Sequence, residues 1–332
     1  MLSLLFVVLK FIIFSNMQLE TTFQPNHPIG RVLIYHFMLG FLVMFGCQED
    51  EVVIIPDNEP PQGQYVSTVQ IENYIQRCFI DLLGREALDE EMEFYFILLK
   101  TNELSGESRD AMLIDLQRDT TYREGDSSYR HAYSQRIYSL GKGRMIESVE
   151  NDYIYQEMGQ LQNDLTGAIN NGDSSLTAFF RERIQDAQAV LDIPRDYRLG
   201  LLTMDSMHVR LMDNLVYDQI NMGTFNFVIS AFDNLLYRYP TDAEYEAGYA
   251  MVEDNVSTTL MGQSGTNRGD FIRIMTEGQA FYQGMIMWTF KTLLLRDPTP
   301  NELSFYIASY YVDKDFEKLQ RSIMSTDEYA NF

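Results

Sequence analysis

Three stretches of this sequence share the pattern Phe-x-x-Leu-Leu-x-Arg: Phe79-Ile80-Asp81-Leu82-Leu83-Gly84-Arg85, Phe232-Asp233-Asn234-Leu235-Leu236-Tyr237-Arg238 and Phe290-Lys291-Thr292-Leu293-Leu294-Leu295-Arg296. One helical turn earlier, the three copies carry Ile75, Val228 and Ile286. Apolar residues therefore recur at i, i+4, i+7 and i+8, which places them on one face of a helix. Each copy predicts an amphipathic helix.

The residues after each arginine also repeat, and they predict the start of a second helix. The later copies continue with Pro240-Thr241-Asp242-Ala243-Glu244 and Pro298-Thr299-Pro300-Asn301-Glu302. Thr three residues before Glu is the spacing of a capping box, in which the hydroxyl and the carboxylate bind free backbone N–H groups at a helix start. Pro300 at the first helical position favours the same start. The first copy keeps Glu91 but has Leu88 in place of the threonine, which leaves its cap unpredicted.

A third helix that ends in an aromatic residue is expected to close each unit. These helices are Leu113 to Tyr122, Phe271 to Phe281 and Leu319 to Tyr329, and Met261 to Asn267 lengthens the second unit. Each unit is interpreted as a three-helix hairpin that cannot bury its apolar face alone and must stack on its neighbours.

The remaining sequence supports an all-α fold of stacked helical-hairpin repeats. Between the first two copies, Ile154 to Ile169 and Leu176 to Leu191 show long helical patterns, and strand signals are nearly absent. The expected organisation is a leader (1–46), a tether (47–69), helical repeat 1 (70–128), a helical middle region (129–224) and helical repeats 2 and 3 (225–332).

The repeat pattern, Leu-Leu-x-Arg-x-Pro-Thr-x-x-Glu followed by a helix and a Ser-or-Thr-x-x-Tyr end, resembles the helical repeats of uncharacterised extracellular bacterial proteins called DUF4214. It also resembles a helical segment of a second uncharacterised family, DUF1549. The resemblance covers the three repeats and not the rest of the chain. It implies a fold and no activity, because neither family brings an established catalytic residue.

The N-terminus predicts a bacterial lipoprotein. Arg31 precedes an apolar run from Val32 to Gly46, which is the layout of a signal peptide. The segment Val43-Met44-Phe45-Gly46-Cys47 resembles a lipobox, in which cleavage leaves the cysteine as the lipidated first residue. The alternative is an uncleaved hydrophobic anchor or hairpin, although the run is shorter than a comfortable membrane span. The first residues of the long leader are interpreted as an over-extended start.

Acidic residues follow the cysteine at once, in Gln48-Glu49-Asp50-Glu51, and Pro56, Pro60 and Pro61 then give 47–69 a tether composition. A cysteine followed by acids resembles the export signal of surface lipoproteins in Bacteroidota. The expected location is therefore the outer membrane, with the lipid-anchored chain on the cell surface. The periplasmic face is the alternative.

Composition excludes several classes of partner and site. The net charge of −23 argues against nucleic acid, whose phosphates require clustered Lys and Arg. An acidic surface also repels anionic lipid, so membrane association would depend on the lipid on Cys47. The other cysteine, Cys78, lies on an apolar helical face and is expected to be a buried free thiol. Beyond the leader only His131 and His208 remain, which excludes a multi-histidine metal site.

A hydrolase is the sharpest enzyme hypothesis that the sequence offers. Ser127 and Ser174 each follow Gly-Asp, and together with His208 of Asp205-Ser206-Met207-His208 they resemble the nucleophile and base of SGNH esterases. Such serines belong at the end of a β-strand, whereas both fall in polar loops between predicted helices. Ser139 and Lys142 match Ser-x-x-Lys, but the Lys-Thr-Gly partner is missing. No catalytic residue, cofactor or metal is predicted.

Structural roles are expected for the remaining charged residues. Asp89, Glu90, Glu91 and Glu93 suit the positive end of a helix dipole better than the paired carboxylates of a glycosidase. The repeated Arg85, Arg238 and Arg296 are expected to bind helix carbonyls or acids of their own repeat. The single tryptophan, Trp288, leaves a sugar-stacking platform open as an alternative.

The function expected from the sequence is that of a non-enzymatic lipoprotein of the cell envelope. It would serve as an interaction or accessory subunit with a protein partner, beside an outer-membrane transport or assembly complex. The alternative is a surface module that binds a glycan or nutrient, and an SGNH-like esterase is the third hypothesis.

Overall fold

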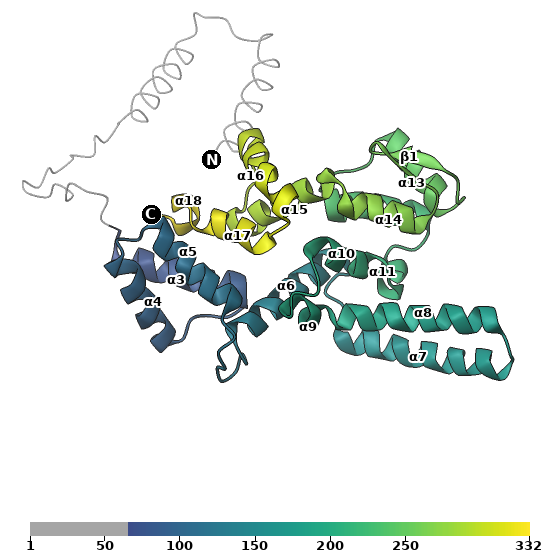
Figure 1. The fold of residues 1–332 in the computed structure, drawn as a ribbon, viewed down its shortest axis with the longest axis horizontal. Coiled ribbons are helices and arrows are strands. Elements are labelled where there is room, and N and C mark those ends of the chain that lie inside the picture. Colours follow the sequence, from purple (N-terminus) through teal and green to yellow (C-terminus); the bar gives the residue numbers. More distant parts are fainter. Residues whose placement is uncertain (1–65) are drawn as a thin grey trace, which may run out of the picture. The chain divides into compact units, whose positions relative to one another are not determined.

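A computed structural model describes residues 66–332, which belong to one compact unit. The predicted leader, Cys47 and nearly all of the predicted tether lie outside these residues. Within them the chain is all-α, as expected, apart from one short β-hairpin (Figure 1). The first described helix begins at Thr68, two residues before the predicted start of repeat 1 at residue 70.

The first repeat forms a hairpin of two helices followed by a third, namely α3 (Thr68–Leu83), α4 (Asp89–Thr101) and α5 (Gly106–Arg118). Ser67 caps α3 with its side chain, and Gly84 ends this helix in a left-handed conformation with φ of 76°. Such a conformation suits glycine, which has no Cβ to clash. The sharp reversal after Leu83 lets α4 pack on α3.

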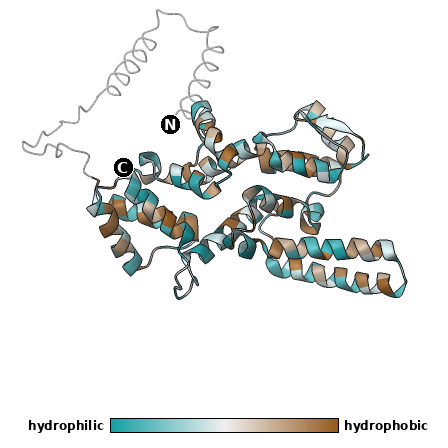
Figure 2. Cartoon of the chain, viewed as in Figure 1, coloured by the Kyte–Doolittle hydropathy of each residue, from teal (hydrophilic) through white to brown (hydrophobic). Residues whose placement is uncertain are grey.

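The middle region is helical throughout, and both long patterns in it are confirmed as helices. It contains α6 (Tyr129–Met145), α7 (Asn151–Asn170), α8 (Ser174–Leu191), α9 (Ile193–Arg198), α10 (Met204–Met212) and α11 (Leu215–Ile220). Figure 1 shows α7 and α8 as an antiparallel pair, and apolar and polar residues alternate along both (Figure 2). Leu161, Leu165 and Ala187 are among the few residues buried in this pair.

The second repeat differs from the first because it contains strands. Its elements are α12 (Thr224–Ala231), a π-helical turn η1 (Phe232–Leu236), α13 (Asp242–Val252), β1 (Thr258–Leu260), β2 (Gln263–Gly265) and α14 (Arg268–Glu277). The strands pair antiparallel, with Leu260 opposite Gln263. The sequence indicated an insertion at this point but not its conformation, since three-residue strands are too short for an alternating pattern.

The third repeat consists of α15 (Gln279–Leu294), α16 (Pro300–Asp313), α17 (Phe316–Met324) and α18 (Asp327–Ala330). The prediction that each closing helix ends in an aromatic residue is wrong. These helices end at Arg118, Glu277 and Met324 instead. The first two end because the backbone becomes extended at Asp119 and Gly278. In the third repeat Tyr329 belongs to the separate helix α18, which Thr326 caps.

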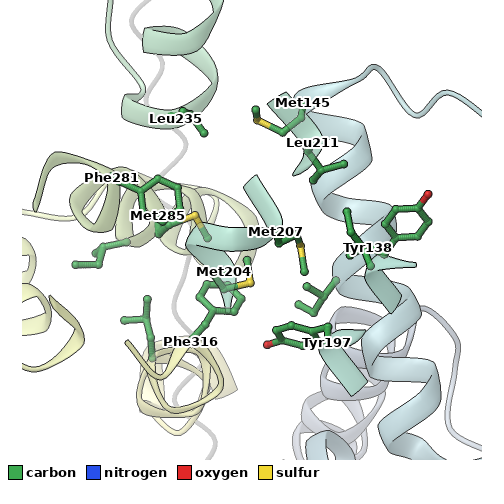
Figure 3. Packing of buried hydrophobic residues seen from close by; sticks show 14 of the residues in the cluster. Tyr138, Met145, Tyr197, Met204, Met207, Leu211, Leu235, Phe281, Met285 and Phe316 are labelled. Atoms are coloured by element: carbon green, nitrogen blue, oxygen red, sulfur yellow. The ribbon is translucent and has the colours of Figure 1, made fainter. Parts of the chain in front are cut away.

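One hydrophobic core runs through the described chain, with buried members from Ile71 to Ala330. Helix α10 lies at its centre and packs on α6 and α14. Figure 3 shows Met204 and Met207 of this helix between Tyr138 on one side and Met285 on the other. The third repeat packs on the first, through α17 against α5 and α18 against α3, and on the second, through α15 against α14 and η1.

Gly284 permits the closest of these approaches. A Cβ atom at this position would lie 1.9 Å from the carbonyl oxygen of Leu235, in the π-helical turn. Two helices can meet at this separation only where one of them has no side chain. The contact between the second and third repeats therefore depends on this glycine.

We expect Gly284→Ala to lower the free energy of unfolding by about 3 kcal/mol or more, because the methyl group overlaps a backbone atom that cannot move alone. Gly159, in the middle of α7, serves as the control, because a Cβ atom added there would meet nothing within 4 Å. Gly159→Ala should raise stability by about 0.5–1 kcal/mol through helix propensity. Denaturant unfolding measures both, and equal effects would contradict the close approach.

The cap of α4 offers a stabilising substitution. Leu88 is 60% exposed and has no side-chain oxygen, while the Glu91 carboxylate accepts a hydrogen bond from the Leu88 backbone N–H at 2.8 Å. Leu88→Thr should add the missing hydroxyl and stabilise the protein by about 0.5–1 kcal/mol. Thr299→Leu should cost a similar amount in α16. The expectation fails if the midpoint of urea unfolding stays the same in both variants.

Candidate functional site

The repeated arginines close the three helical hairpins. Each guanidinium donates two hydrogen bonds to the carboxylate six residues later: Arg85 to Glu91 at 2.7 and 2.8 Å, Arg238 to Glu244 at 2.8 and 2.6 Å, and Arg296 to Glu302 at 2.9 and 2.7 Å. We call each of these pairs an Arg–Glu clamp. The expectation that the arginines bind acids of their own repeat is confirmed.

The clamps share the rest of their geometry as well. Each arginine also donates to the carbonyl of the next residue and lies 5.1–5.3 Å from the ring of the phenylalanine that opens the repeat. Each glutamate also accepts the backbone N–H of the residue three positions earlier. One carboxylate thus caps the second helix and holds the turn that precedes it.

These contacts lower the pKa of the glutamates. The hydrogen bonds from Arg238 and Arg296 lower the pKa of Glu244 and of Glu302 to about 2. Burial raises the pKa of Glu91, but the hydrogen bonds from Arg85, Leu88 and Tyr129 outweigh it and leave the pKa below its usual value. All three carboxylates are therefore ionised at neutral pH and are committed to the fold.

The two Gly-Asp-Ser segments have structural roles. Asp126 accepts a hydrogen bond from Arg85 at 2.8 Å, and the hydroxyl of Ser128 caps α6. Asp173 caps α8 by accepting from the backbone of Leu176. Ser127 and Ser174 are exposed residues of the loop before α6 and of the first turn of α8. The structure therefore places neither serine at the end of a β-strand.

His208 is buried in α10 and is 3% exposed. Its Nδ1 lies 2.7 Å from the carbonyl oxygen of Met204, which makes Nδ1 the donor, and its ring packs edge-on against Phe281. Burial lowers its pKa to about 4, an effect that the bond to Met204 partly offsets. Neither Ser127 nor Ser174 is among its hydrogen-bond partners within the described residues, so the structure does not bring the esterase constellation together.

Lys142 is also engaged in the fold. Its ammonium group donates to the carbonyl of Val149 at 2.8 Å and to Asn151 at 2.9 Å, which ties the end of α6 to the start of α7. Burial lowers its pKa. Ser139, one turn earlier on α6, is exposed while Lys142 is 8% exposed, so the Ser-x-x-Lys match is not a joint site.

The remaining candidates also occupy structural positions. Asp89, Glu90 and Glu91 form the first turn of α4, where Glu91 belongs to a clamp, and Glu93 is exposed one turn on. Cys78 is fully buried, and burial raises the pKa of its thiol. The Nδ1 atom of His131 lies 3.1 Å from a guanidinium nitrogen of Arg198. Trp288 stacks on Phe316 at 5.7 Å, so one face of the indole is already occupied.

A groove of about 320 Å³ lies where the antiparallel pair α7 and α8 meets α9 and α10. It is lined by Met158, Ile184, Gln185, Gln188, Ala189, Asp192, Asp196 and Arg210. Arg210 donates a hydrogen bond of 2.8 Å to the Asp196 carboxylate and lowers the pKa of that carboxyl. The opposite charges of these two side chains therefore compensate each other. The lining contains no aromatic ring on which a sugar could stack. Sequence patterns did not indicate this groove, because it joins residues from four helices.

Large apolar side chains remain exposed on two of the three second helices of the repeats. The most exposed are Phe94 and Ile97 on α4, at 61% and 56%, and Phe305 and Val312 on α16, at 72% and 80%. Because exposed apolar residues that share a helix face can mark an interaction surface, these two faces are the candidate contact sites of the described chain. In the sequence, these exposed faces could have been recognised only as a second stripe of apolar residues on each helix, in addition to the buried one.

Comparison of the chain with known protein families, with characterised proteins and with solved structures found no match. Within residues 66–332, no helix is both long and apolar enough to cross a membrane. The same residues contain no group of three or more His, Cys, Asp or Glu side chains arranged to hold a metal ion.

The buried His208 predicts a pH dependence of stability. The unfolded chain binds a proton on this imidazole below a pKa of about 6.5, whereas the folded chain resists it down to a pKa of about 4. The contribution of this group to the free energy of unfolding should therefore be fully present above pH 6.5. It should decrease by roughly 2–3 kcal/mol as the pH drops toward 4. Urea unfolding of the wild type and of His208→Gln at both pH values measures the difference. An identical slope in the two proteins would contradict the assignment.

Proposed function

We propose that this chain is a non-enzymatic lipoprotein of the bacterial cell envelope that serves as an interaction or accessory subunit. The proposed anchor is lipid on Cys47, supported by the signal-peptide layout before Gly46 and the acidic run after it. The proposed setting is the outer membrane, with the chain on the cell surface beside a transport or assembly complex.

The observation that carries the interaction role is the exposure of apolar side chains on α4 and α16. Burying the larger of these side chains against a partner would contribute about 1.5–3 kcal/mol each. The residues that could have supported catalysis have other uses: His208 bonds to a backbone carbonyl, Lys142 joins two helices and Glu91 closes a hairpin.

A glycan-binding role has less support. The groove beside α9 lacks an aromatic lining residue, and Trp288 is stacked on Phe316. Titration calorimetry with soluble polysaccharides tests this alternative, and binding heat with any of them would favour it over a protein partner.

We expect Cys47→Ser to move the chain from the detergent phase to the aqueous phase when bacterial envelopes are extracted and separated with Triton X-114. The reason is that anionic lipid repels a chain with a net charge of −23 once its acyl groups are lost. Cys78→Ala is the matched control, because this second thiol is buried, and it should stay in the detergent phase. Intact-mass analysis of the mature N-terminus reports the acylated cysteine directly.

Two results would contradict the proposal. One is an unmodified Cys47 in the mature protein, which removes the anchor. The other is a chain that purifies alone from detergent-solubilised envelopes without any recurring protein partner, which removes the accessory role. Protease treatment of intact cells separates the cell surface from the periplasmic face.

A further inference from the structure

Three aromatic rings lie in contact on the surface of the second repeat. The ring centroid of Phe225, in α12, lies 5.4 Å from that of Tyr245, in α13, and Tyr245 lies 5.9 Å from Tyr249, one turn further along α13. Phe225 is 56% exposed, and both tyrosines are partly exposed. We call these three side chains the aromatic surface. Because the rings touch one another, they offer a partner one continuous contact and not three separate side chains.

Carboxylates border this aromatic surface. Thr224, the residue before Phe225, donates a hydrogen bond to Glu253, which follows Tyr249 by one helical turn. The negative charge of Glu253 raises the pKa of the Tyr249 phenol, with a further contribution from Asp254, so both carboxylates lie near that ring. Glu253 and Asp254 are themselves exposed. Aromatic rings and carboxylates are thus accessible together at this place on the second repeat.

Elsewhere in the fold, arginine is the side chain that combines these two kinds of contact. In residues 66–332, each arginine that lies over an aromatic ring also forms an ion pair with a carboxylate. These arginines are Arg77, Arg85, Arg109, Arg123, Arg130, Arg144, Arg183, Arg238, Arg268 and Arg296. The planar guanidinium can stack on a ring while its N–H groups bind a carboxylate, so one side chain serves both groups.

The charge of this region favours a basic partner. Within the described residues, no Arg or Lys lies over the rings of the aromatic surface or forms an ion pair with Glu253. From residue 211 to residue 267 the sequence has eight Asp or Glu residues and one basic residue, Arg238, which belongs to a clamp. A chain with a net charge of −23 attracts a positively charged segment and repels another copy of itself.

We infer that the aromatic surface binds an arginine from a basic segment of a partner protein, with the guanidinium over the rings and its N–H groups directed at Glu253. This contact rests on the proposed interaction role and deepens it by stating the chemistry of the partner. Lysine is expected to bind less well, because its ammonium group is not planar and cannot bind a carboxylate through two parallel N–H groups. An exposed contact of this kind is weak, so the association should be reversible.

Hydroxyl-radical footprinting of the purified full chain, read by mass spectrometry, tests where a basic peptide binds. Tetra-arginine should lower the oxidation of Phe225, Tyr245 and Tyr249, because a bound guanidinium covers these rings. Phe305 on α16 is the internal control, since it is 72% exposed and lies outside the aromatic surface, and its oxidation should stay unchanged. Tetra-lysine carries the same charge and should protect the three rings less.

Substitutions separate this site from diffuse attraction to an acidic chain. Phe225→Ala and Glu253→Gln should each raise the tetra-arginine concentration that half-protects Tyr249 by about threefold, and together by about tenfold. Phe305→Ala and Glu182→Gln are the matched controls and should leave this concentration unchanged. All four residues are exposed, so equal thermal unfolding midpoints of the variants verify the fold.

The inference is overturned if tetra-lysine protects the rings as well as tetra-arginine does, or if the peptide protects Phe305 equally, since the attraction is then diffuse. Protection by a soluble polysaccharide and not by tetra-arginine also overturns it, because the aromatic surface then binds sugar. A protein partner that co-purifies equally with the wild type and with the Phe225→Ala, Glu253→Gln double variant supports the accessory role but places the contact elsewhere. None of these outcomes depends on whether Cys47 is acylated.

Discussion

The bidentate contact between an arginine and the glutamate six residues later fixes the local geometry of all three repeats. The chain must reverse direction between the two helices of each hairpin, and it does so through a left-handed residue at Gly84, Tyr237 or Leu295. Two of these three residues have a Cβ atom that makes this conformation unfavourable. A charged pair placed directly after the reversal, with the arginine over a phenylalanine ring, stabilises the turn at that point.

The same glutamate links two levels of structure. It accepts the backbone N–H at the start of the second helix, which is a local requirement of that helix, and it binds the arginine, which fixes the preceding turn. In the first repeat the clamp extends further, because Arg85 also binds Asp126 and Glu91 also accepts from Tyr129. In the third, Arg296 also binds Glu328 of α18. Two hairpins are thus joined to later segments of the chain, whereas the β-hairpin packs on the second helix of the remaining one.

This use of charged residues bears on function. Asp126, His208 and Lys142 resemble parts of catalytic motifs in sequence, but the first neutralises a clamp arginine and the other two bond to backbone carbonyls inside the fold. The surface that remains is acidic, with apolar stripes on α4 and α16.

The sequence by itself predicted the amphipathic helices, the capping boxes of the second and third repeats, and the binding of the repeated arginines within their own repeats, because these features depend on residues fewer than ten positions apart. It also indicated that Cys78 would be buried, since one helical face carries the apolar residues around it. Tertiary structure decided that the insertion pairs as strands, and that Gly284 meets the π-helical turn at Leu235. It also assembled the groove beside α9 and buried His208 against Phe281. These features join residues far apart in the chain, and a helical period specifies which side chains share a face but not what lies against that face.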